Sequence, residues 1–93
     1  MDVVTFAAQH GIAVDYFSMK GKGFCLMDEG RYYIAVNAAL PNSEKLEVIL
    51  HELGHILTGS DYTESESESE RIRKEQNAIN WATANRKRFA DII

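Results

Sequence analysis

The stretch VILHELGHIL, residues 48–57, decides how this chain folds. It contains an H-E-x-x-H motif in which His51 and His55 lie four residues apart. On a helix this spacing places both imidazoles on one face, one turn apart, so that they can reach a single zinc ion. Glu52, next to the first histidine, is then placed to take a proton from a water at the metal. Apolar residues at helical spacing surround the motif, which predicts a central helix with one face on a sheet and the other in a cleft.

Upstream of the motif, the sequence predicts one short helix and three short strands. Asp2 can cap a helix over residues 2–10, and Gly11 can end it. Residues rich in β-branched and aromatic side chains then predict strands over residues 12–17, 24–27 and 31–36. Three short strands in succession favour a small, largely antiparallel sheet.

Glycine and polar residues mark the connections between these elements. Residues 28–30, Asp-Glu-Gly, predict a tight hairpin between the second and third strands. Asn42 or Ser43 is expected to cap the motif helix, and Gly59 is expected to end it. We expect the strand over residues 31–36 to form a sheet edge that can bind extended peptide by strand addition.

Residues 59–70 form an acidic segment rich in serine and glutamate, which ends in ESESESE. This composition predicts a solvated loop or the frayed start of a helix, and the alternative is a lid or a docking segment. A last helix is expected from about Ser67 to about Arg88. The sequence shows no repeat, so residues 1–93 are expected to form a single domain.

Glu75 lies in the middle of the apolar face of this last helix. The apolar face is formed by Ile72, Ile79, Ala82 and Phe89, with Ala78 and Trp81 beside them. A carboxylate on a buried face costs free energy unless it is paired or bound to a cation. Catalytic zinc takes three protein ligands and leaves one position for water, so the histidine pair needs a third ligand. We expect Glu75 to be that ligand, with Glu68, seven residues earlier on the same stripe, as its rival.

The parts of this site predict the hydrolysis of an amide bond. Zinc lowers the pKa of its water towards about 7 and polarises a carbonyl, while Glu52 acts as general base and passes the proton to the leaving amine. Tyr62 is a candidate donor to the oxyanion, although a loop aromatic is the simpler interpretation. We interpret His10 as a histidine at a helix end and Cys25 as a small buried hydrophobe.

Composition and charge narrow the class of protein further. The 93 residues carry a net charge of -4, which argues against nucleic acid as the main partner. The one cysteine allows no internal disulfide and suits a reducing compartment. The N-terminus lacks the basic residues of a signal peptide, and no apolar run approaches the roughly 20 residues that span a membrane. We therefore expect a cytoplasmic protein.

Two segments of the chain resemble one known family. VILHELGH, residues 48–55, and EQNAINWA, residues 75–82, are similar to the two signature elements of the ImmA/IrrE zinc metallopeptidases. The resemblance implies an α+β, zincin-like minimal domain, with a small, mostly antiparallel three-stranded sheet packed on an active-site helix and a second, ligand-bearing helix. It also implies that His51, His55 and Glu75 bind Zn2+ and that Glu52 is the catalytic acid/base.

Members of this family are bacterial or phage-encoded and often lie beside the gene of a helix-turn-helix repressor. The resemblance therefore implies a zinc endopeptidase that cleaves a protein substrate of this kind. From charge and composition we expect it to be cytoplasmic and to bind neither nucleic acid nor membrane directly. The alternative is a non-catalytic, zinc-containing module that acts on a repressor by contact. A third interpretation is an exopeptidase for short peptides, which would need a group that holds a peptide terminus.

Overall fold

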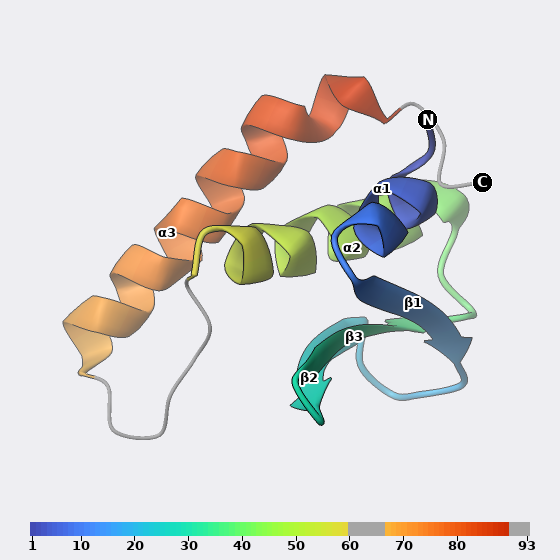
Figure 1. The fold of residues 1–93 in the computed structure, drawn as a ribbon, viewed down its shortest axis with the longest axis horizontal. Helices are drawn as coiled ribbons and strands as arrows, with labels where there is room; N and C mark the ends of the chain where they lie inside the picture. Colours follow the sequence, from blue (N-terminus) through green and yellow to red (C-terminus); the bar gives the residue numbers. More distant parts are fainter. Residues whose placement is uncertain (60–66, 90–93) are drawn as a thin grey trace.

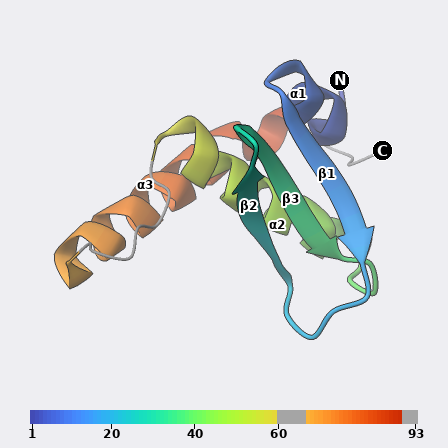
Figure 2. The ribbon, with the colours of Figure 1, turned by 60° about the horizontal axis from the view of Figure 1, so that its bottom comes forward.

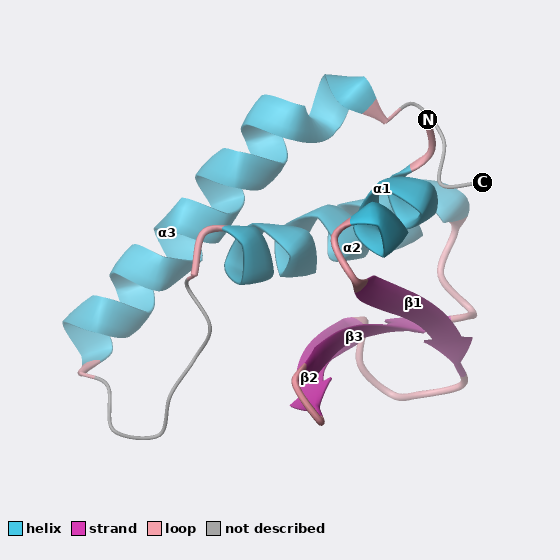
Figure 3. Cartoon of the chain, viewed as in Figure 1, coloured by secondary structure: helices cyan, strands magenta, loops and turns pink. Residues whose placement is uncertain are grey.

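The computed structural model of this protein describes residues 1–59 and 67–89, which form a small α+β domain. Figures 1 and 3 show how the helices and strands are arranged. In chain order the elements are α1 (Val3–Gln9), β1 (Ile12–Phe17), β2 (Gly23–Asp28), β3 (Arg31–Asn37), α2 (Asn42–Leu57), α3 (Glu68–Asn85) and the 3-10 turn η1 (Arg86–Arg88). Within the described residues, none of these helices combines the length and the apolar character that a membrane crossing needs.

The sheet is mixed, with the strand order β1-β3-β2. Strand β3 pairs antiparallel with β2 and parallel with β1, so the expected antiparallel arrangement holds for one of the two pairings. The expectation that residues 31–36 form an edge was wrong, because β3 returns from its hairpin and inserts between β1 and β2. The side-chain amide of Asn37 holds the connection between β1 and β2 by donating to the carbonyls of Met19 and Gly21, at 3.1 and 2.9 Å.

The hairpin between β2 and β3 has the predicted position and a two-residue turn. Glu29 and Gly30 have φ angles of 51° and 77°, the left-handed values that a type I′ turn requires. Asp28 pairs with Arg31 across this turn, which fixes the register of the two strands. Register matters here because a shift by one residue would turn the partly buried Cys25 to the opposite face of the sheet.

Helix α2 lies between the sheet on one side and α3 on the other (Figures 1 and 2). The expected central position of this helix is therefore confirmed. Residues of α1, the sheet, α2 and the C-terminal turn together form one buried core, made of Val3, Phe6, Ala7, Ile12, Ile34, Val36, Leu46, Ile49, Leu50, Leu53 and Phe89.

Helix α3 packs against α2, and fewer of its apolar residues are buried than the apolar stripe in the sequence predicts. Ile72 and Ile79 are 64% and 42% exposed, whereas Ala78 is fully buried. Because Ala78 is small, the backbone of α3 comes close to α2 along this line, and the larger isoleucines are left at its margins.

Side chains cap two of the three α-helices, and the cap at Asp2 was expected. An Asp2 carboxylate oxygen accepts from the Thr5 amide at 2.8 Å, and this hydrogen bond holds the pKa of Asp2 below its ordinary value. Ser67 accepts from the Glu70 amide at the start of α3. The expectation that Asn42 or Ser43 caps α2 was wrong, because both residues follow the N-cap Pro41, which offers no side-chain cap.

We expect Leu50→Ala to lower the free energy of unfolding by about 2–5 kcal/mol, because Leu50 is fully buried in the core and the loss of its side chain leaves a cavity. Urea denaturation followed by circular dichroism measures this change. The control is Ile72→Ala, which removes an aliphatic side chain that is 64% exposed and should change stability by less than about 0.5 kcal/mol. Equal losses in the two variants would contradict this account of the core.

Candidate metal centre

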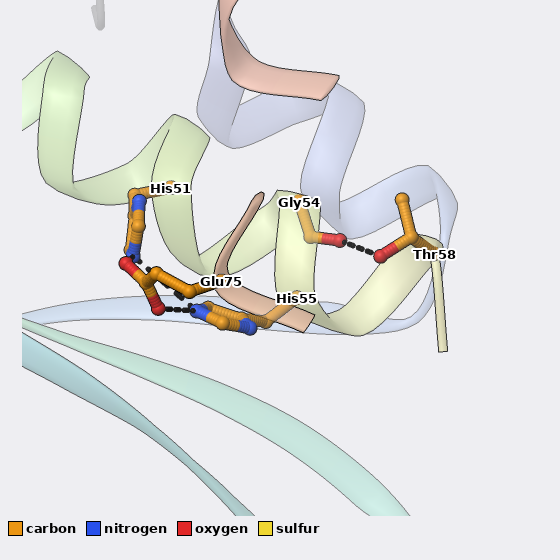
Figure 4. Close-up of polar contacts among 5 residues, drawn as sticks. All are labelled: His51, Gly54, His55, Thr58 and Glu75. Atoms are coloured by element: carbon orange, nitrogen blue, oxygen red, sulfur yellow. Dashed lines mark hydrogen bonds and ion pairs between the residues drawn. The ribbon is translucent and has the colours of Figure 1, made fainter. Parts of the chain in front are cut away.

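Three side chains that can bind metal converge from two helices (Figure 4). His51 and His55 project from α2, and Glu75 projects from α3. His51 Nε2 lies 2.8 Å from Glu75 Oε1, and His55 Nε2 lies 3.1 Å from Glu75 Oε2. The two Nε2 atoms are 3.3 Å apart. One donor atom from each of the three residues therefore faces the same small volume.

These distances fit a tetrahedral zinc ion. Zinc binds histidine nitrogen at about 2.0–2.1 Å and carboxylate oxygen at about 2.0–2.2 Å, so two donors of one tetrahedral ion lie about 3.3 Å apart. The separation of the two imidazole nitrogens, 3.3 Å, matches this value, and the two nitrogen–oxygen distances are slightly shorter. Two histidines and one glutamate are also a ligand set of catalytic zinc, which leaves a fourth position for water.

The group formed by His51, His55 and Glu75, called the metal group below, is buried on one side and open to solvent on the other. The side chain of His55 is 3% exposed, whereas those of His51 and Glu75 are 32% and 37% exposed. The imidazole of His55 is buried, and the two partly exposed side chains leave a route from solvent. An ion at this position would be accessible to a substrate without any opening of the core.

Gly54 sets the distance between the two helices that carry the metal group. A Cβ atom built on Gly54 would lie 2.5 Å from the carbonyl oxygen of Ala78 and 2.9 Å from its Cα. Ala78 follows Glu75 by three residues, so this contact is one helical turn from the carboxylate. The Thr58 hydroxyl donates to the Gly54 carbonyl at 2.6 Å, which adds a partner for the last turn of α2 (Figure 4).

A cleft of about 750 Å³ adjoins the metal group, and Glu52 is one of the residues that line it. Helix α2 forms one wall, the C-terminal half of α3 forms the other, and the start of β2 borders it. The lining residues are Lys22, Gly23, Glu44, Glu47, Val48, His51, Glu52, Ile79, Ala82, Thr83, Arg86 and Lys87. Since His51 belongs both to the metal group and to the cleft, a molecule in the cleft would reach the metal position and Glu52 together.

Comparison with known proteins agrees with this geometry. The model of the IrrE N-terminal-like domain, a peptidase family, matches residues 7–86. The chain belongs to this family. The match runs from the last residues of α1 to the start of η1, and so includes both ligand-bearing helices of this IrrE-like domain. The curated proteins and the solved structures yielded no match.

The remaining residues singled out in the sequence lie apart from the metal group or outside the described residues. In this IrrE-like domain Glu68 is the first residue of α3, and the structure brings Glu75 to the histidines instead. His10 ends α1 and its Nδ1 lies 3.0 Å from the Phe6 carbonyl, as expected for a helix-end histidine. Cys25 is partly buried against the core. Tyr62 lies outside the described residues, as do residues 60–66 of the acidic segment.

Sequence reasoning missed one ion pair in the cleft of this IrrE-like domain. Arg86 Nε donates to Glu47 Oε1 and so links α2 to the end of α3. Spacing could have indicated it, because Glu47 precedes His51 by four residues and Arg86 follows Ile79 by seven. Both residues therefore lie on the helix faces that line the cleft. The side chains are 41% and 57% exposed, so this pair contributes little stability.

We expect Gly54→Ala to destabilise the protein and to weaken zinc binding. Alanine favours a helix interior over glycine by about 1 kcal/mol, so helix propensity alone predicts stabilisation. The new Cβ instead collides with the Ala78 backbone and moves Glu75 away from the histidines. Urea denaturation of the metal-free protein and zinc titration against a competing chelator measure the two effects.

Gly21→Ala is the control for this substitution, because a Cβ at Gly21 meets nothing within 4 Å. Its zinc affinity should equal that of the unsubstituted protein. Gly54→Ala protein with raised stability and unchanged zinc affinity would contradict the role assigned to this contact.

Proposed function

We propose that this protein is a zinc-dependent endopeptidase that hydrolyses a peptide bond in a protein substrate. The observation that carries the proposal is the convergence of His51, His55 and Glu75 beside a cleft that contains Glu52. Membership of a peptidase family supports the same reaction class. A helix-turn-helix repressor is the proposed substrate, and the resemblance of the two motif segments to ImmA/IrrE peptidases supports this choice.

The residues of the site would have two separate roles in such a reaction, metal binding and proton transfer. His51, His55 and Glu75 would hold the zinc ion, and the rigid packing of α2 on α3 fixes their separation. When bound, zinc supplies a Lewis acid that polarises a carbonyl and makes water more acidic. Glu52 lines the same cleft, and its carboxylate would accept a proton from the attacking water and donate it to the leaving amine.

The exposed edge of β2 offers a main-chain binding site for an extended substrate. The main-chain N–H of Asn37 donates to the Lys22 carbonyl at 2.9 Å. Alternate residues of β2 from Lys22 onward therefore turn their main-chain N–H and C=O groups towards β3. The main-chain groups of Gly23, Cys25 and Met27 consequently point away from the sheet. Gly23 also lines the cleft, so a strand added to this edge would run toward Glu52.

We expect Glu52→Gln to keep zinc and to lower the rate of substrate cleavage by about 10²–10⁴-fold, because the amide cannot accept the proton. Metal analysis and mass spectrometry of the candidate repressor after incubation measure the two properties. Glu68→Gln is the matched control, since it changes a glutamate outside the metal group and should alter neither zinc content nor cleavage. Unchanged biological activity of the Glu52→Gln protein would instead favour the non-catalytic binding module.

We expect Met27→Pro to weaken the binding of extended peptide about tenfold, because proline removes an outward N–H from the β2 edge. Met27→Ala keeps that N–H and serves as the control. Fluorescence anisotropy with a labelled substrate peptide measures affinity, and metal analysis checks that zinc content is the same in both variants. Equal affinities of the two variants would contradict strand addition at this edge.

A further inference from the structure

A second glycine contact lies on the side of α2 that faces the sheet. A Cβ atom built on Gly23, the first residue of β2, would lie 2.6 Å from the Val48 Cγ1 atom and 2.5 Å from the Ala35 carbonyl oxygen. Both distances are well inside the roughly 3.5–4.0 Å at which non-bonded carbon atoms pack. Gly23 does not have a positive φ angle, so the lack of space, and not a left-handed backbone, requires glycine here.

The two neighbours of Gly23 belong to well-packed parts of the fold. Ala35, on the central strand β3, is 5% exposed. Val48 is half-buried and packs against the core, and the next two residues of α2, Ile49 and Leu50, are fully buried. Neither neighbour can move far without disturbing the core. A side chain at position 23 would therefore displace the start of β2.

Val48 lies one helical turn before the histidine motif. It precedes His51 by three residues and Glu52 by four, so the three side chains lie along one face of α2. All three residues line the cleft, and Gly23 lines it too. The contact between Gly23 and Val48 therefore sets the distance between the start of β2 and the turn of α2 that carries Glu52.

Gly23 also belongs to the sheet edge that is proposed to bind substrate. Strand β2 is an outer strand of the sheet (Figure 2), and the main-chain groups of Gly23, Cys25 and Met27 point away from β3. A substrate strand on this edge would bond to Gly23 at the end that adjoins the cleft. The distance of that strand from Glu52 then depends on how closely Gly23 approaches Val48.

We propose that Gly23 and Val48 are positioning residues, and that their contact holds the bound substrate strand at the distance from Glu52 that hydrolysis requires. The inference rests on the proposed peptidase function and on strand addition at β2. A displacement of about 1 Å between a substrate and a catalytic group can cost about 100-fold in rate. Because Cys25 and Met27 would still bind the strand, a displacement at Gly23 should affect catalysis more than binding.

Steady-state cleavage of the candidate repressor by the zinc-loaded protein tests this inference. We expect Gly23→Ala to lower kcat about 10–100-fold and to raise KM by less than about threefold. Mass spectrometry at several repressor concentrations gives both constants. Zinc affinity, titrated against a competing chelator, should not change, because the new Cβ meets Val48 and Ala35 and not the Gly54–Ala78 contact.

Two variants separate this effect from a general change in β2. Gly21→Ala makes the same substitution two residues earlier, where a Cβ meets nothing within 4 Å, and should keep both kcat and KM. Met27→Pro removes an outward N–H at the other end of β2. It should raise KM and change kcat little, which is the opposite pattern to that of Gly23→Ala.

Variants of Val48 test the same contact from the helix and add no atom beside β3. Val48→Ala removes Cγ1 from a half-buried position and should lower kcat about 3–10-fold, because the start of β2 loses its support. Val48→Ile keeps both branches at Cβ and should retain kcat. The double substitution Gly23→Ala and Val48→Ala relieves one of the two collisions, so its kcat should exceed that of Gly23→Ala alone.

The outcomes separate this inference from the proposed function. Equal kcat in the unsubstituted, Gly23→Ala and Val48→Ala proteins would overturn the inference while supporting hydrolysis. A loss of zinc affinity in Gly23→Ala that matches its loss of kcat would also overturn it. If Gly23→Ala does not fold, the Val48 pair decides, and equal kcat in Val48→Ala and Val48→Ile contradicts the inference. No cleavage by the zinc-loaded unsubstituted protein would contradict the peptidase function and this inference together.

Discussion

The close contact between α2 and α3 at Gly54 and Ala78 is the constraint on which the rest of this structure depends. The two histidines come from one helix and the carboxylate from the other, so the distance between the helix axes decides whether they meet. A single side-chain atom on Gly54 would collide with the backbone of α3. The site therefore depends on the lack of a Cβ at Gly54 as well as on the three ligands themselves.

A metal in this position would also take part in the stability of the fold. A chain of 93 residues buries a modest apolar core, and α3 adds few large buried side chains to it. The α2–α3 interface instead contains the buried His55 and the partly exposed His51 and Glu75. Polar groups in such an interface contribute stability when a cation satisfies them, so metal binding and the docking of α3 are coupled.

Local patterns in the sequence predicted most of the helices and strands and the members of the site. Helical spacing identified the α2 face that carries the histidines, and the placement of Glu75 on an apolar stripe identified the carboxylate that meets them. Both patterns repeat over a few residues and act within one element. The hairpin at Glu29 and Gly30 is equally local, since its turn needs only residues that accept left-handed backbone angles.

The errors concern properties that no single segment determines. The position of β3 between β1 and β2 depends on how the connection before β2 crosses the sheet, which Asn37 fixes from a distance in sequence. The exposure of Ile72 and Ile79 depends on how closely α3 approaches α2 at Ala78. Periodicity shows that a helix has an apolar side, but the neighbouring backbone decides which part of that side is buried.

X-ray absorption spectroscopy at the zinc edge of the metal-loaded protein tests the central claim most directly. The account predicts one zinc ion per chain, with two imidazole nitrogens and further oxygen or nitrogen ligands at about 2.0–2.2 Å, and no sulfur ligand. In Glu75→Ala protein the spectrum should keep the two imidazoles, and titration against a competing chelator should show reduced zinc affinity. A spectrum with fewer than two imidazoles, or one that Glu75→Ala leaves unchanged together with the affinity, would contradict the convergence of the three residues on one ion.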